Sequence, residues 1–143
     1  MDFISHNESE TNILANQISL QVKGGDILLL SGELGSGKTT FTKAFASAIG
    51  VKEVVTSPTF VILKRYHLSE AKNDISELIH TDCYRLSSPD DAYSIGLDEY
   101  FARTDVVTLI EWPEKIESII PAHAKKISFE YVDENTRKIS YNF

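Results

Sequence analysis

An eight-residue segment from Gly32 to Thr39, Gly-Glu-Leu-Gly-Ser-Gly-Lys-Thr, fits the phosphate-binding pattern G-x-x-x-x-G-K-[ST] at every fixed position. Glycine tolerates positive φ, so such a loop can turn its N–H groups inward and bind an anion at the start of the following helix. Lys38 would then contact the β- and γ-phosphates of a nucleotide, and Thr39 would offer its hydroxyl to Mg²⁺. The alternative is a glycine-rich turn before an ordinary helix. The nucleotide-binding residues expected here are Glu33, Leu34, Gly35, Ser36, Gly37, Lys38, Thr39 and Thr40.

Two carboxylates follow predicted strands and could complete such a site. Asp82 comes after residues 75–80, and Glu111 comes directly after residues 106–110. A nucleotide site needs an acidic group for Mg²⁺ at the carboxyl end of a strand near the loop. We expect Asp82 to hold Mg²⁺ and Glu111 to orient the attacking water, with Lys38 as the third catalytic residue. Both carboxylates are candidate metal ligands beside Thr39, so the reverse assignment stays open. As a further alternative, Glu111 caps a helix that starts at Pro113.

Three other side chains are candidates for the same site. Thr59 closes the turn Thr56-Ser57-Pro58-Thr59, and it either senses the γ-phosphate as a switch residue does or belongs to a plain strand-entry turn. Trp112, the only tryptophan, either covers the nucleotide or packs in the core. His80 has no second histidine or cysteine at zinc-ligand spacing, so we expect it to orient a neighbouring side chain.

Hydrophobic periodicity indicates the elements that must position these residues. Residues 26–31 are short, apolar and β-like, and apolar side chains then recur with helical spacing from 41 to 49, before Gly50. Ser5 and Glu8 have the spacing of a capping box and predict a helix through residue 18. Strands are predicted at 60–66 and 75–80, separated by a polar stretch at 69–74. Residues 106–110 are apolar on both faces, which is typical of a central parallel strand.

The last third of the chain predicts short helices and a hairpin. Ser88-Pro89 starts a helix that Gly96 interrupts, and Pro113 opens another. Alternating residues at 127–131 and 139–143 flank a turn at 133–136. The pattern indicates a three-layer α/β fold like that of P-loop NTPases, with a central, mainly parallel sheet, helices on both faces and antiparallel edge strands. We expect residues 1–143 to form one such domain, with its ligand beyond the carboxyl ends of the strands.

Composition excludes several classes of function. The net charge of −7 argues against an extended nucleic-acid surface, so a partner is expected to hold any RNA. No apolar run approaches the roughly 18 residues of a membrane helix, and the first residues lack the features of a signal peptide. We therefore expect a cytoplasmic protein without a membrane partner. Cys83 is the only cysteine, which excludes an intrachain disulfide and predicts a buried, inert thiol.

In the order and spacing of its motifs, the chain resembles the TsaE family, the small ATPases of bacterial tRNA threonylcarbamoyladenosine (t6A) synthesis. The resemblance extends over essentially the whole chain. It rests on the phosphate loop followed in order by Ser57-Pro-Thr-Phe60, His80-Thr-Asp-Cys-Tyr-Arg-Leu86, Gly96-Leu-Asp-Glu-Tyr-Phe101 and Ile110-Glu-Trp-Pro-Glu114.

The resemblance implies that the chain binds ATP with Mg²⁺ and hydrolyses it in concert with the TsaB and TsaD transferase proteins, through which it meets tRNA only indirectly. It also implies slow hydrolysis by the isolated protein. By the same analogy Lys38 and Thr39 hold phosphate and Mg²⁺, and Asp82 lies near the metal. Thr59 would belong to a switch-like loop, and Glu111 and Trp112 would flank the nucleotide.

Two other classes of protein share the phosphate loop. A small-molecule kinase normally needs an acceptor pocket and an arginine-bearing lid, whereas we expect the four arginines, Arg65, Arg85, Arg103 and Arg137, not to cluster. A guanine-specific switch would carry an Asn-Lys-x-Asp segment, and Lys72-Asn73-Asp74 has the wrong order.

Overall fold

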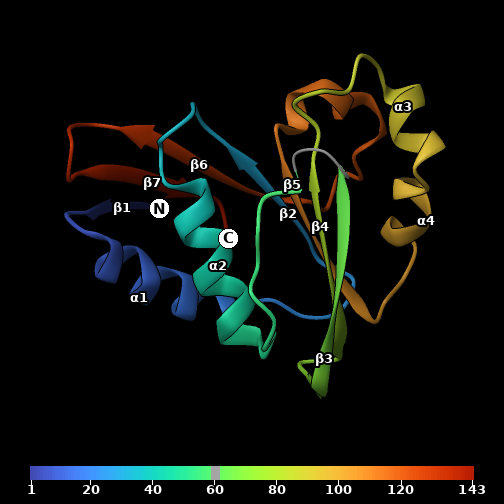
Figure 1. Ribbon diagram of the computed structural model, residues 1–143, viewed down its shortest axis with the longest axis horizontal. Helices are drawn as coiled ribbons and strands as arrows, with labels where there is room; N and C mark the ends of the chain where they lie inside the picture. Colours follow the sequence, from blue (N-terminus) through green and yellow to red (C-terminus); the bar gives the residue numbers. More distant parts are fainter. Residues whose placement is uncertain (59–61) are drawn as a thin grey trace.

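The computed structural model describes residues 1–58 and 62–143 and shows a mixed sheet with helices on both faces (Figure 1). The strands are β1 (Asp2–Ser5), β2 (Ile27–Ser31), β3 (Leu63–Lys72), β4 (Ile75–Asp82), β5 (Val106–Glu111), β6 (Lys125–Tyr131) and β7 (Arg137–Tyr141). The helices are α1 (Glu8–Ser19), α2 (Lys38–Ile49), α3 (Pro89–Ser94), α4 (Leu97–Phe101) and the 3₁₀ helix η1 (Pro113–Ile119).

The strand order is β1-β7-β6-β2-β5-β4-β3. The four inner strands β6, β2, β5 and β4 run parallel, whereas β3, β7 and β1 pair antiparallel at the two edges. All six residues of β5 are buried, as expected for a central strand covered on both faces. The predicted fold class is therefore confirmed, and so is the hairpin formed by β6 and β7.

Each face of the sheet carries its own hydrophobic core. Helices α1 and α2 pack against each other and cover one face, where Phe41 and Phe45 are fully buried. Helices α3, α4 and η1 cover part of the other face, with Leu97 and Ile116 fully buried against β2 and β5. Cys83 is buried in this second core, and burial raises the pKa of its thiol to about 12. The sheet is thus fixed from both sides.

The beginning of the chain differs from the prediction. Residues 2–5 form the edge strand β1, which pairs with β7, and α1 begins only at Glu8. Its N-cap residue is Asn7, whose side-chain oxygen accepts a hydrogen bond from the backbone N–H of Glu10 at 2.9 Å. The predicted Ser5 cap is wrong because Ser5 lies in the strand, where its hydroxyl bonds to Thr11.

The hairpin of β3 and β4 also differs in its boundaries. Strand β3 continues to Lys72, so most of the predicted polar separator is strand, and only Asn73 and Asp74 form the turn. Both have positive φ, 51° and 63°, as a two-residue type I′ turn requires. Polar residues are tolerated in β3 because it is an edge strand with one exposed side.

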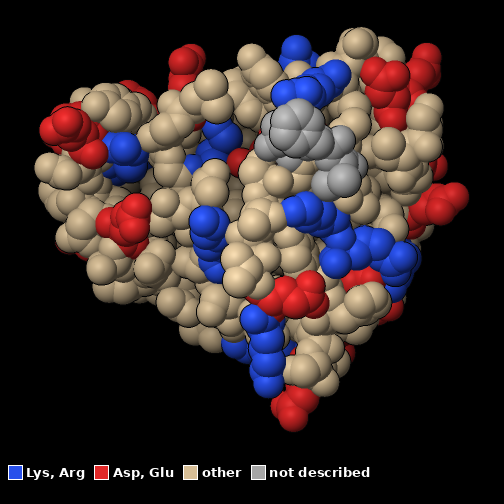
Figure 2. Space-filling model, in the orientation of Figure 1, with Lys and Arg blue, Asp and Glu red and all other residues tan. Residues whose placement is uncertain are grey.

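Charged side chains are unevenly spread over the visible face of the molecule. Figure 2 shows acidic side chains at the edge formed by α3 and α4, whose first turns carry Asp90, Asp91, Asp98 and Glu99. The lysines and arginines on this face occur in small groups separated by uncharged residues. Among the described residues, no helix is long and apolar enough to cross a membrane.

Candidate nucleotide-binding site

The glycine loop joins the end of β2 to the start of α2. Gly35 and Gly37 have φ of 77° and 103°, the left-handed region that favours glycine, and Gly37 is the N-cap residue of α2. A Cβ at Gly32 would lie 2.5 Å from the Phe129 carbonyl oxygen and 2.7 Å from the Ser36 hydroxyl. The loop is therefore seated on β6 with no room for a side chain at Gly32, and its turns require glycine. This strand, loop and helix order is the arrangement that the sequence predicts.

Lys38 is held inside this loop. Its side chain is buried, and the ammonium group donates hydrogen bonds to the carbonyl oxygens of Gly32 and Glu33. Burial lowers the pKa of Lys38, while the negative charges of Glu111 and Asp82 act in the opposite direction. The ring centroid of Trp112 lies 4.8 Å from the ammonium nitrogen, close enough for a cation–π interaction.

The two predicted carboxylates lie side by side. Asp82 is the last residue of β4 and Glu111 the last of β5, and the two are partners in the parallel register. Glu111 is buried, and its Oε2 is 2.9 Å from Nε2 of His80. The expected orienting role of His80 thus has a defined partner. The carboxylate does not cap η1, because Trp112 is the N-cap residue there and Glu111 bonds to His80 instead.

Asp82 differs from Glu111 in its surroundings. It is partly exposed, and its Oδ1 accepts a hydrogen bond from the backbone N–H of Tyr84 at 2.9 Å. Burial raises the pKa of Asp82, and the neighbouring negative charge of Glu111 also raises it. The hydrogen bond from Tyr84 lowers this pKa, but its effect is smaller than that of burial. A cation beside it would favour the charged carboxylate. Among the described residues, no three His, Cys, Asp or Glu side chains group as metal ligands, so a metal here would need other oxygen ligands.

A pocket of about 670 Å³ brings the candidate residues together. Its volume is within the range of small-molecule sites. Thr59 lies outside the described residues. Of the predicted site residues, those that line the pocket are Glu33, Leu34, Gly35, Ser36, Gly37, Lys38, Thr39, Thr40, Asp82, Glu111 and Trp112.

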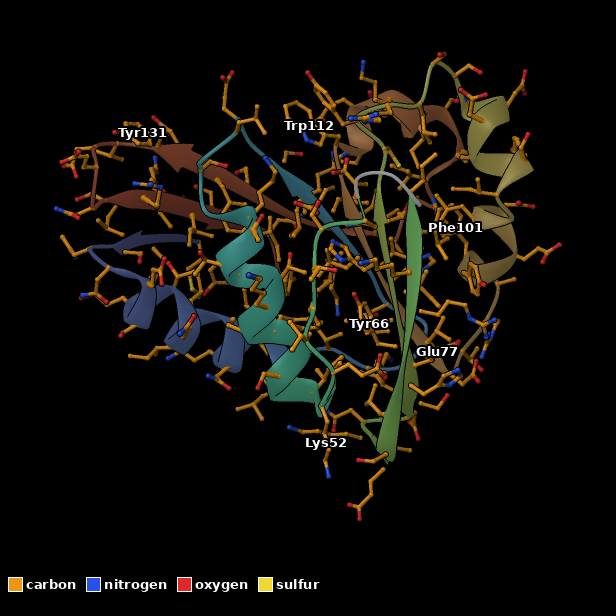
Figure 3. All side chains as sticks on the ribbon, viewed as in Figure 1. Lys52, Tyr66, Glu77, Phe101, Trp112 and Tyr131 are labelled. Carbon is orange, nitrogen blue, oxygen red and sulfur yellow. The ribbon has the colours of Figure 1, made fainter. Side chains whose placement is uncertain are left out.

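Trp112 packs against the core and also reaches the pocket, so its expected place over the nucleotide stays a prediction. It is partly buried against the second core, and it also lines the pocket, where its ring lies 4.9 Å from that of Tyr84. Its φ of 57° is unusual for a non-glycine residue and turns the chain sharply after Glu111. Figure 3 shows the tryptophan at the opposite end of the view from Lys52, which follows α2.

Two parts of the pocket wall were not predicted. The N-terminal segment contributes Ser5, Asn7, Glu8 and Thr11, and the β6–β7 hairpin contributes Glu134 and Asn135 from its turn and Arg137 from the start of β7. The Arg137 guanidinium lies 4.6 Å from the ring centroid of Tyr131, and its Nε donates to the Gly35 carbonyl oxygen at 3.0 Å. Nothing in the local sequence indicates this contact, because it joins residues 102 positions apart.

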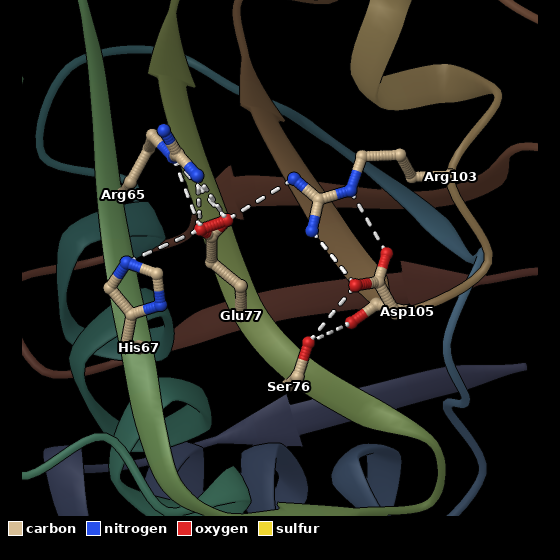
Figure 4. A network of polar contacts seen from close by, with 6 residues as sticks. All are labelled: Arg65, His67, Ser76, Glu77, Arg103 and Asp105. Carbon is tan, nitrogen blue, oxygen red and sulfur yellow. Dashed lines mark hydrogen bonds and ion pairs between the residues drawn. The ribbon is translucent and has the colours of Figure 1, made fainter.

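The expectation that the arginines do not cluster is wrong for Arg65 and Arg103. Both converge on the buried carboxylate of Glu77 near the amino-terminal end of β4 (Figure 4). Arg65 contacts both carboxylate oxygens, the shortest distance being 2.8 Å, and Arg103 also pairs with Asp105 at 2.8 Å. Neither arginine lines the pocket, where Arg85 and Arg137 are found instead.

Comparison with known proteins identifies the family. The family model described as "Threonylcarbamoyl adenosine biosynthesis protein TsaE" matches residues 5–139. The chain belongs to the TsaE family. The resemblance that the sequence motifs indicate is thereby confirmed.

Individual relatives agree over most of the chain. This TsaE protein is 38% identical over 135 residues to a Bacillus subtilis protein named "tRNA threonylcarbamoyladenosine biosynthesis protein TsaE", covering 94% of this chain and 80% of the relative. Proteins of the same name from Treponema pallidum and Streptomyces coelicolor are 33% and 42% identical, covering 98% and 74% of this chain and 98% and 70% of the relatives. The crystal structure of Bacillus subtilis YdiB is similar, with a TM-score of 0.79 and 34% identity over 99% of this chain and 83% of that one.

Proposed function

We propose that this TsaE protein binds ATP with Mg²⁺ and hydrolyses it as the accessory ATPase of t6A modification of tRNA. The observation that carries the proposal is the convergence of the glycine loop, Lys38 and Thr39 with Asp82 and Glu111 on one pocket. The names of its relatives supply the pathway, since they are called t6A biosynthesis proteins.

The residues present suit a nucleotide phosphate chain. Ser36 carries a buried hydroxyl without a hydrogen-bond partner among the described residues, and it faces Gly32 across the loop. A polar group of this kind is costly to bury unpaired and is ready to contact a ligand oxygen. The backbone amides of residues 33–38 and the Lys38 ammonium would bind the phosphates, close to the amino-terminal end of the α2 dipole.

Thr39 and Asp82 are the side chains that would hold Mg²⁺, which when bound neutralises charge on the phosphates. The pairing of Asp82 with Glu111 supports this assignment, because a cation between two neighbouring carboxylates would offset their repulsion. Glu111 is buried, hydrogen-bonded and fixed at the end of a central strand, which suits a group that orients water for attack. We keep the reverse roles of the two carboxylates as the alternative arrangement.

The partners proposed for this activity are the TsaB and TsaD transferase proteins, with tRNA bound through them. The −7 net charge fits this division of labour, since a protein that itself held tRNA would need clustered cations. A small-molecule kinase and a nucleotide-dependent switch share the loop, but no described feature of the pocket favours either.

The test compares ATP turnover by the protein alone and together with TsaB and TsaD, using the wild type, Lys38→Ala and the control Lys52→Ala. Lys52 is exposed and does not line the pocket. We expect slow turnover alone, stimulation by the partners, and loss of turnover and of t6A formation only in Lys38→Ala. Unstimulated turnover, or full t6A formation with Lys38→Ala, would contradict the proposal.

A further inference from the structure

His80 is a buried polar side chain to which the proposed reaction assigns no contact with the nucleotide. It is 2% exposed and lies on β4, two residues before Asp82 and on the same face of the strand. Its Nε2 is 2.9 Å from Oε2 of Glu111. Its Nδ1 has no hydrogen-bond partner within residues 1–58 and 62–143. Among the described residues, the ring of His80 therefore makes a hydrogen bond to the Glu111 carboxylate alone.

The chemistry of the two groups determines which of them donates. An ionised carboxylate can only accept a hydrogen bond, so Nε2 of His80 is the donor, and Nδ1 is left as a buried polar atom without a partner among the described residues. An unpaired buried polar atom costs free energy. An apolar side chain of similar size would fill this space without that cost, so packing alone does not account for a histidine here.

The hydrogen bond restricts the orientation of the Glu111 carboxylate. The terminal torsion of glutamate is broad and roughly two-fold, so packing against the stem leaves the carboxylate plane free to turn. A hydrogen bond from a neighbouring strand fixes that plane, because β4 and β5 pair with each other and each has a further strand on its other side. Both side chains are buried, His80 being 2% and Glu111 5% exposed, so solvent has little access to the bond although Glu111 also lines the pocket.

We propose that His80 is the positioning residue for Glu111. Its Nε2–H holds Oε2, so that the carboxylate presents Oε1 to the pocket that Glu111 lines. The inference rests on the proposed ATPase function, and it adds a residue that acts through Glu111 without touching the nucleotide.

Three variants separate positioning from packing. His80→Gln keeps an amide donor near the position of Nε2, whereas His80→Leu fills the space without a donor. Leu78→Val is the packing control, because Leu78 is fully buried on the same face of β4 and bonds to nothing in the pocket. Steady-state ATP hydrolysis is measured for the protein with its partners, and MgADP affinity is measured by calorimetry.

We expect His80→Leu to lower kcat about 10- to 100-fold, as removal of a partner behind a site carboxylate typically does. The KM for ATP and the affinity for MgADP should stay within about threefold, because phosphate contacts are unchanged. His80→Gln should recover most of the lost kcat, and Leu78→Val should lower the melting temperature without changing kcat. Full kcat in His80→Leu, equal slowing in Leu78→Val, or no recovery in His80→Gln would each overturn the proposal.

A second measurement tests the hydrogen bond without any hydrolysis. Long-range ¹H–¹⁵N spectra of the wild-type protein should show His80 as the Nε2–H tautomer, with a proton signal that is lost in Glu111→Ala. A His80 ring protonated only on Nδ1 would overturn the positioning role even if ATP is hydrolysed. A wild type that shows this bond but neither binds nor hydrolyses ATP would instead refute the proposed function alone.

Discussion

Replacement of Gly32 by alanine tests how the phosphate loop is seated. The new Cβ would lie 2.5 Å from the Phe129 carbonyl oxygen and 2.7 Å from the Ser36 hydroxyl, and φ at this position is 151°. Ordinary contact begins near 3.4 Å, so the loop must move away from β6 by about 0.9 Å, the difference between 3.4 and 2.5 Å. Because the Gly32 carbonyl also accepts a hydrogen bond from Lys38, the ammonium group would be displaced with it.

The matched control is Gly35→Ala. Gly35 also has positive φ, 77°, but a Cβ there would meet nothing within 4 Å. Both variants carry a backbone strain of roughly 1 to 2 kcal/mol, and the clash at Gly32 adds about 1 to 3 kcal/mol. We therefore expect Gly32→Ala to lower the free energy of unfolding by about 2 to 5 kcal/mol, and Gly35→Ala by no more than about 2 kcal/mol.

The assays are urea unfolding followed by circular dichroism and calorimetric titration with MgATP. Because the displaced Lys38 ammonium would lose its position beside the phosphates, Gly32→Ala should also bind MgATP more weakly than Gly35→Ala. Equal stability and equal affinity of the two variants would refute the view that β6 forms the floor of the loop.

Three further predictions concern groups outside the pocket. The Cys83 thiol, with a pKa of about 12 caused by burial, should react with a thiol reagent at pH 8 only after denaturant is added; rapid labelling of the native protein would contradict this. Arg65→Ala and Arg103→Ala should each lower the free energy of unfolding by about 1 to 2 kcal/mol, but together by about 3 to 5 kcal/mol, because the double variant leaves buried Glu77 with the exposed His67 as its one remaining ion-pair partner among the described residues. A double-mutant cycle measures this coupling, and strictly additive losses would argue against a shared carboxylate. The hydrogen bond from Arg103 lowers the pKa of Asp105 from 3.8 to about 2, so the stability it contributes is present above pH 3.8 and lost as pH falls through about 2. Unfolding of Asp105→Asn followed from pH 5 to pH 2 should show its deficit relative to wild type shrinking in acid, and a constant deficit would disprove the linkage.

The sequence predicts the centre of the site because its signals are local. The loop pattern, the apolar strand before it and the helix after it lie within 25 residues, so each constrains its neighbours directly. Asp82 and Glu111 could also be placed, since each ends an apolar run, and parallel strands bring their carboxyl ends to one edge of the sheet.

The parts that sequence reasoning missed depend on long-range pairing. Strand β1 has only four residues and exists because β7, at the other end of the chain, offers it a partner. The same pairing brings Ser5 and Arg137 to the pocket, and no local sequence pattern predicts that these two residues meet. The predicted strand ends at residue 66, whereas β3 continues to Lys72, because the residues of this last part are polar. An edge strand does not need the alternation of apolar and polar residues that predicts a strand.

The clustering of arginines shows the same limitation. Arg65 and Arg103 are 38 positions apart in the chain, and they meet only because β3 and the segment that follows α4 lie on either side of Glu77 (Figure 4). The glutamate near the start of β4 is the one signal that the sequence offers, since a charge that a strand buries needs partners.

Calorimetric titration of MgATP into the wild-type protein and into Lys38→Ala tests the central claim most directly. The arrangement of the loop, Lys38 and the paired carboxylates predicts saturable heat at one site per chain, with affinity at least tenfold weaker in the variant. The absence of binding heat for the wild type in several buffers, or equal affinity of the two proteins, would contradict the assignment of this pocket to a nucleotide.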